Sequence, residues 1–180
     1  MHINNLREYQ QAVKDLILDE VNYLKEVIWR EAACGESVVE LKKPFFPDYA
    51  IGKSDHAYLL DTHNKKYVQD RILIDLENEG FFYYAAKNGM LGIKFDQAAK
   101  GSFAWRCKLK SLKMTISDFL INDLKEAVTK NHNLRVFSFL HYNLSEAELS
   151  EVESVLSKFG YTLSIKRDKE GKLSQACVSW

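Results

Sequence analysis

Apolar and polar residues alternate along this chain with two periods, one typical of helices and one typical of strands. From about residue 5 to 33 the apolar residues recur every three or four positions, which predicts one long amphipathic helix or two joined ones, and Gly35 follows as an end signal. Residues 37–41, SVVEL, form a β-branched run that predicts a strand. After an irregular stretch at 43–64, the helical period returns at 65–79.

A β-hairpin is expected directly after this second helix. Gly80 is a typical residue to end a helix. Asn88-Gly89 supplies the two positive-φ residues of a type I′ turn, so residues 81–87 and 90–95 are expected to pair as antiparallel strands.

The second half of the chain repeats the order of helix, strand, helix and hairpin. Its two helices are expected to begin at capping boxes, formed by Thr115 with Asp118 and by Ser145 with Glu148. Its strand is expected at 134–140, LRVFSFL, and its hairpin at 161–179 with a turn at 168–171.

The two halves can be aligned by counting. Gly80 and Gly160 are offset by 80 positions, whereas Gly35 and Asn133 are offset by 98, so the first half is 18 residues longer, within 43–64. A unit of about 80 residues buries little surface on its own. We therefore expect an α+β protein of two fused helix–strand–helix–β-hairpin units that pack as one compact protein with a mainly antiparallel sheet. The first unit is expected at 1–98, with an inserted loop at 43–64, and the second at 99–180.

Composition narrows the classes of function. Hydrophobic residues make up 46% of the chain and charged residues 28%, which is typical of a soluble globular protein. Basic and acidic residues number 25 each, so the net charge attracts neither nucleic acid nor membranes. The three cysteines are far apart and have no metal-binding spacing, and the chain has neither a signal peptide pattern nor a membrane-spanning run. We expect a cytoplasmic protein with reduced thiols and no cofactor.

The inserted loop at 43–64 is the first candidate site. It is rich in aromatic residues, and exposed aromatic side chains supply much of the binding energy at protein interfaces. The expected anchors for a protein partner are Phe45, Phe46, Tyr49 and Tyr58. A homo-oligomer is one form that such binding can take.

The same loop also carries carboxylate and imidazole side chains, which are common ligands of transition metals and common acid–base pairs. The residues concerned are Asp48, Asp55, His56, Asp61 and His63. Their spacing matches no known zinc or two-histidine-carboxylate pattern. A metal-dependent hydrolase or nuclease is therefore kept only as an alternative function.

The segment between the halves offers another alternative. In residues 103–110, FAWRCKLK, apolar and basic residues alternate, which predicts a half-buried strand with one basic face. Such a face could contact a phosphate backbone and stack bases, through Trp105, Arg106, Lys108 and Lys110. The competing interpretation is an edge strand whose lysines prevent aggregation.

Sequence motifs of catalysis are largely missing. The chain has no glycine-rich phosphate-binding loop, no nucleophile elbow and no CxxC pair. Whether the protein is an enzyme stays open, and a binding protein is the favoured interpretation.

Three repeated features resemble those of a known group of proteins. They are the helix end in EAACGESVVEL, the helices that close on Gly-Phe or Gly-Tyr, and the final hairpin that ends in SQACVSW. In these features the chain resembles small duplicated α/β accessory proteins of tailed bacteriophages. The resemblance implies a virion or assembly component, or a factor that binds a host protein in the host cytoplasm, and it assigns no catalytic residue.

Overall fold

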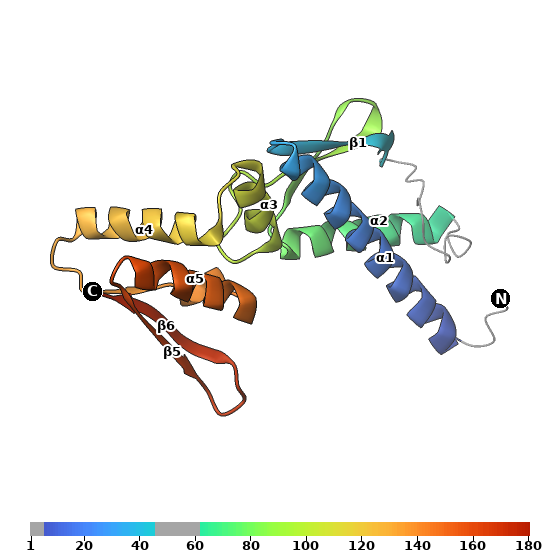
Figure 1. Cartoon of the computed structure of the whole chain (residues 1–180). Coiled ribbons are helices and arrows are strands. Elements are labelled where there is room, and N and C mark those ends of the chain that lie inside the picture. The colour runs from blue at the N-terminus through green and yellow to red at the C-terminus, as the bar shows by residue number, and fades with distance from the viewer. Residues whose placement is uncertain (1–5, 46–61) are drawn as a thin grey trace. The chain divides into compact units, whose positions relative to one another are not determined.

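The computed structural model describes residues 6–45 and 62–180 of the chain (Figure 1). The chain divides into two compact units. Unit 1 is built from residues up to 98 together with 103–111, and unit 2 from 99–102 together with 112–180. Each unit combines helices with a three-stranded antiparallel sheet. The fold is therefore α+β, as the sequence pattern predicts.

Unit 1 contains three helices and three strands among its described residues. They are α1 (Leu6–Ala33), β1 (Val38–Pro44), α2 (Thr62–Asn78), β2 (Phe82–Ala85), β3 (Met90–Lys94) and α3 (Phe103–Ser111). The predicted hairpin is confirmed, because β2 and β3 pair antiparallel. Its turn has Asn88 at φ 59° and ψ 29° and Gly89 at φ 71°, both positive, which a type I′ turn requires.

Unit 2 contains α4 (Ile116–Lys130), β4 (Val136–Ser138), α5 (Glu146–Lys158), β5 (Thr162–Arg167) and β6 (Leu173–Ser179), with a short 3₁₀ turn at Leu140–Tyr142. Both predicted capping boxes are confirmed. The side chains of Thr115 and Ser145 each accept a hydrogen bond from a backbone N–H in the first turn of their helix, and the carboxylate of the acidic residue there accepts one from the backbone N–H of the cap residue.

The two sheets have the same strand order and the same register. Unit 1 has the order β1-β3-β2, and unit 2 has β4-β6-β5. In unit 1, Lys94 lies between Val38 and Phe82. In unit 2, Ser179 lies between Val136 and Thr162. Val38 and Val136 are offset by 98 positions and Phe82 and Thr162 by 80, which are the offsets counted from the sequence. Lys94 and Ser179, in the central strands, are offset by 85 because the second hairpin loop is longer.

The second helix of each unit also ends in the same way. Gly80 and Gly160 follow α2 and α5 with positive φ of 88° and 79°. The next residue in each unit donates its N–H to the carbonyl of a leucine, Leu76 or Leu156, at 3.1 Å and 3.2 Å. Both leucines are only 1% exposed. Positive φ at the helix end lets the chain turn back toward the sheet, which places β2 and β5 equivalently.

The segment at 103–110 is not a strand, and that prediction is wrong. It forms α3, which packs against α1 in unit 1. Alternation cannot distinguish the two structures here, because Ala104 is buried as well as Trp105, Cys107 and Leu109, so the segment is apolar on most sides. Its membership of unit 1 also differs from the expected division at residues 98 and 99. Among the described residues, no helix is long and apolar enough to cross a membrane.

Candidate functional site

The predicted partner-binding residues fall largely in the part of the loop that the structure does not describe. Phe46, Tyr49 and Tyr58 lie there. Phe45 is described and is fully buried, at 0% exposed, so its prediction as a surface anchor is wrong. The backbone at Phe45 is also held in unit 1. The buried Gln69 of α2 donates a hydrogen bond from Nε2 to the Phe45 carbonyl oxygen at 2.7 Å.

Gln69 has a telling counterpart in unit 2. By the offset of 80 that joins the two second helices, its equivalent is Leu149, an apolar core residue that is 3% exposed. Unit 1 thus has an amide side chain where unit 2 has a leucine, and this amide contacts Phe45. A carbonyl group buried without a hydrogen bond is costly, and the amide satisfies it.

We expect Gln69→Leu to lower the free energy of unfolding of unit 1 by about 2 kcal/mol. The substitution introduces the leucine that unit 2 has at the equivalent position, but it removes the hydrogen bond to the Phe45 carbonyl oxygen. Urea denaturation of the wild type and the variant measures the change. An unchanged midpoint would show that the hydrogen bond does not hold this part of the chain.

The predicted metal ligands are not brought together by the described structure. Asp48, Asp55, His56 and Asp61 lie outside the described residues. The backbone of His63 lies in the first turn of α2, and its side chain is not described. Between residues 6–45 and 62–180, no three His, Cys, Asp or Glu side chains form a group that could hold a metal ion. The alternative of a metal-dependent hydrolase stays a prediction for the loop alone.

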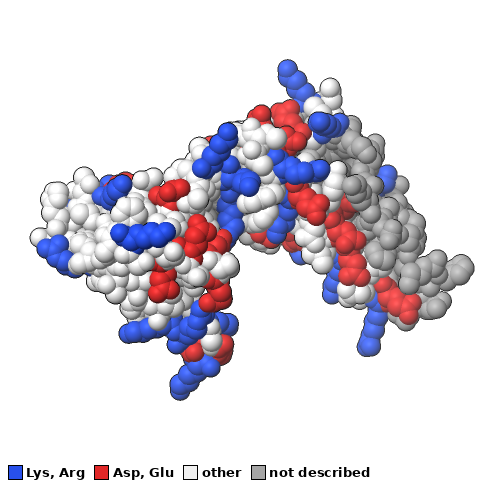
Figure 2. All heavy atoms as spheres, in the orientation of Figure 1, with Lys and Arg blue, Asp and Glu red and all other residues white. Residues whose placement is uncertain are grey.

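The predicted nucleic-acid strand is corrected by α3. Trp105 is 1% exposed, so its ring is not available to stack on a base. In a helix, Arg106 and Lys110 share one side while Lys108 points to another, so the three cations do not form one basic face. Lys110 lies over the ring of Trp29, with its Nζ 5.2 Å from the ring centroid. Figure 2 shows basic and acidic side chains interspersed over the described residues on the face in view.

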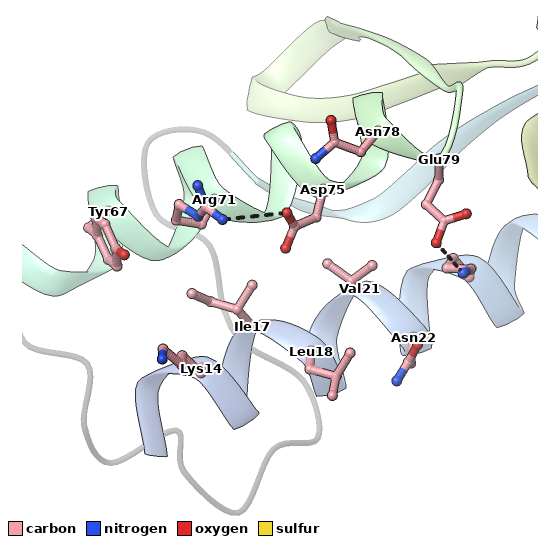
Figure 3. Close-up of a pocket in the computed structure, with 11 residues that line it drawn as sticks. Lys14, Ile17, Leu18, Val21, Asn22, Tyr67, Arg71, Asp75, Asn78 and Glu79 are labelled. Atoms are coloured by element: carbon pink, nitrogen blue, oxygen red, sulfur yellow. Dashed lines mark hydrogen bonds and ion pairs between the residues drawn. The ribbon is translucent and has the colours of Figure 1, made fainter. Parts of the chain in front are cut away.

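A groove of about 560 Å³ lies between α1 and α2 in unit 1 (Figure 3). The α1 side includes the apolar Ile17 and Val21, and the α2 side includes the charged Arg71 and Asp75. Four of its charges form two ion pairs: Arg71 contacts Asp75 at 3.7 Å, and Lys25 of α1 contacts Glu79 at 2.6 Å. Because the groove mixes cations and anions, its charges do not favour a ligand of one sign strongly.

The described thiols do not form a nucleophilic site. Cys107 is fully buried in α3, and this burial raises the pKa of its thiol to about 12. At neutral pH the thiol is therefore protonated and has little nucleophilic character. Cys34 is exposed and Cys177 is half-buried, and neither has a disulfide partner among the described residues.

A polar cluster in unit 2 holds residues 99–102 in place. Asp123 of α4 forms an ion pair with Lys100 and accepts a hydrogen bond from the hydroxyl of Tyr142. The Lys100 ammonium also lies 5.5 Å from the ring centroids of both Phe119 and Tyr142. Burial and the hydrogen bond to Asp123 raise the pKa of the Tyr142 hydroxyl, which keeps it a neutral donor. Every charge in this cluster has a partner, so we interpret it as structural.

The remaining candidate is a groove in unit 2, which we call the Trp180 groove. It lies between α4 and the ends of the β5–β6 hairpin and has a volume of about 430 Å³. It is lined by Leu124, Lys125, Val128, Thr129, Tyr161 and Trp180. Trp180 is 40% exposed, and its ring meets that of Tyr161 edge to face at a centroid distance of 6.2 Å.

The same aromatic pair exists in unit 1, where it is covered. Phe81 and Phe95 occupy the positions of Tyr161 and Trp180 by the offsets of 80 and 85, and their rings also meet edge to face, at 6.4 Å. Both are buried, at 2% and 0% exposed. Phe103, the first residue of α3, packs on the ring of Phe81 at 6.0 Å. Unit 2 therefore leaves partly exposed an aromatic pair whose counterpart in unit 1 is buried, with Phe81 packed against the first residue of α3.

The sequence contains a signal for this site that its patterns alone did not reveal. An aromatic residue follows the helix-ending glycine in both halves, at Phe81 and Tyr161. The pairing partner of each is set by the strand register, which the sequence does not show. Comparison of the chain with protein-family models, with curated proteins and with solved structures finds no match.

Proposed function

We propose that this chain acts by binding another protein, and that the Trp180 groove of unit 2 is the binding site. The observation that carries the proposal is the 40% exposure of Trp180 in an apolar groove whose counterpart in unit 1 is closed. Tryptophan and tyrosine dominate the binding energy of many interfaces. A groove that presents both, backed by buried Leu124, offers a partner a ready-made apolar anchor point.

The chemistry of the groove supports binding over catalysis. Its lining consists of apolar and aromatic side chains, one threonine and the single cation Lys125. It brings together neither a nucleophile with a base nor a pair of carboxylates, which are the combinations that acid–base and covalent catalysis need. The lining therefore favours contact with a side chain of a partner over chemical conversion of a substrate.

The other functional expectations remain predictions. Phe46, Tyr49 and Tyr58 stay candidate contacts in the loop, and they would add a second surface in unit 1. The resemblance to bacteriophage accessory proteins fits a chain that works by binding, and a location in the host cytoplasm would follow from it.

Site-specific photocrosslinking tests the proposed function. A benzophenone amino acid at position 129, in the groove, is expected to yield adducts with another protein in an extract of cells that carry the gene. The matched control places the same amino acid at position 153, on the exposed side of α5. Trp180→Ala should reduce the adducts at position 129 by about tenfold or more. Equal labelling at both positions, or no adduct from the groove, would contradict the proposal.

A further inference from the structure

Unit 1 shows what fills the position of the Trp180 groove when it is closed. The ring of Phe103, the first residue of α3, packs against the rings of Phe81 and of Trp29 in α1, with centroid distances of 6.0 Å and 5.9 Å. The Lys25 ammonium lies 4.5 Å from the centroid of the Phe103 ring. The N–H of Ala104 donates to the Glu79 carbonyl oxygen at 3.0 Å, which fixes the start of the helix. An aromatic residue in the first helical turn is thus the anchor.

The elements that receive α3 in unit 1 recur in unit 2. Trp29 lies in the last two turns of α1, and Lys125 and Val128 lie in the last two turns of α4. Tyr161 stands in the place of Phe81, and the backbone of Phe159 stands in the place of Glu79 by the same offset of 80. Trp180 of unit 2 is 40% exposed, whereas its counterpart Phe95 is 0% exposed.

We infer that the Trp180 groove binds an amphipathic α-helix of a partner protein in the way that unit 1 holds α3, with an aromatic side chain of the first helical turn against Tyr161. This inference rests on the proposed function. Helices that lay an apolar face into a groove are a recurrent mode of recognition, and unit 1 provides an intramolecular template for it.

Charge distinguishes the partner helix from α3. In α3, Lys110 lies over Trp29 at 5.2 Å. At the corresponding end of α4, the groove presents the cation Lys125. A lysine near it would be repelled, whereas an acidic residue would form an ion pair. The partner helix therefore carries an acidic residue where α3 has Lys110.

A second copy of this chain is a poor occupant of the groove. Its own α3 is already packed in unit 1, where Trp105, Cys107 and Leu109 are at most 3% exposed. Supplying α3 to another molecule would expose these three side chains in order to cover one groove. The balance of buried apolar surface favours a helix from a different protein.

Titration of the full-length chain with helical peptides tests the inference. The probes are stapled peptides with the sequence of residues 101–113, Cys107 replaced by Ser, and either Lys110 retained or Lys110→Glu. Backbone amide NMR shifts of the labelled chain report the site. We expect saturable 1:1 binding of the Lys110→Glu peptide with shifts in α4 and β6, and at least threefold weaker binding of the Lys110 peptide at low salt.

Two controls locate the contact. Phe103→Ala in the peptide, and Trp180→Ala in the chain, should each weaken binding about tenfold or more. Tyr67→Ala removes an aromatic side chain that is 55% exposed and lies outside the groove, so it should leave the affinity unchanged. Trp180→Phe should recover part of the affinity, and the amide spectrum of each variant verifies that it is folded.

The inference is overturned if no peptide binds at 1 mM, if the shifts lie in α1 and α2, or if Trp180→Ala abolishes a homodimer seen by analytical ultracentrifugation. The last result would place a second copy in the groove. If crosslinking at position 129 succeeds while the peptides fail, the protein-binding function stands and the helical partner does not. If both experiments fail, both proposals fall.

Discussion

Leu156→Ala is expected to lower the free energy of unfolding of unit 2 by about 3 kcal/mol. Leu156 is 1% exposed, and its carbonyl also accepts the hydrogen bond from Tyr161 that closes the end of α5. Truncation of a fully buried leucine leaves a cavity that the neighbours fill only in part. Native-state hydrogen exchange, measured amide by amide, separates β6 of unit 2 from β3 of unit 1.

The repeat supplies a matched control for this variant. Leu76 occupies the equivalent position in unit 1, has the same 1% exposure and accepts the same hydrogen bond, from Phe81. We expect Leu76→Ala to accelerate exchange in β3 and to leave β6 unchanged, and Leu156→Ala to do the reverse. Equal acceleration in both sheets by either variant would mean that the two units unfold as one.

Gly101→Ala is expected to lower the free energy of unfolding of unit 2 by about 3 kcal/mol. Gly101 has a φ of +85°, which L side chains rarely adopt. A Cβ there would also lie 2.6 Å from the His141 carbonyl oxygen and 3.0 Å from backbone atoms of Tyr142. Because these neighbours are backbone atoms, the turn itself would have to move.

Gly171→Ala separates the two contributions. Gly171 has a similar φ of +80°, but a Cβ there would meet nothing within 4 Å. It is therefore expected to cost only the conformational part, about 1 kcal/mol. Thermal denaturation of the two variants against the wild type measures the difference. Similar losses at both glycines would show that the close approach of residue 101 to the Leu140–Tyr142 turn carries no weight.

The order of elements and the duplication could be predicted because they depend on local rules. Helix-ending glycines, capping boxes and the Asn88-Gly89 turn each act over a few residues, and each is found in the structure. The offsets of 98 and 80, counted from glycine and asparagine positions, are the offsets that relate the two outer strands of one sheet to those of the other. A repeated sequence pattern therefore carried information about register as well as about element type.

The predictions that are wrong concern residues whose packing overrides the local sequence pattern. Residues 103–110 alternate like a strand, but burial against α1 on several sides selects a helix. Phe45 is an aromatic residue in a predicted loop, yet its side chain is buried and its carbonyl oxygen accepts a hydrogen bond from the buried Gln69. The Trp180 groove could not be predicted, because both halves have an aromatic pair at this place and only the packing of the folded units buries one pair and leaves the other partly exposed.

The interleaving of the chain between the units limits how it can be divided. A fragment that stops at residue 98 lacks α3, and one that starts at 112 lacks the lysine that pairs with Asp123. No single proteolytic cut separates two complete halves. On the ribosome, unit 1 can finish once residue 111 has emerged, while residues 99–102 must wait for α4 to be synthesised. During synthesis, these four residues therefore leave the exit tunnel before the part of unit 2 that they pack against has been made.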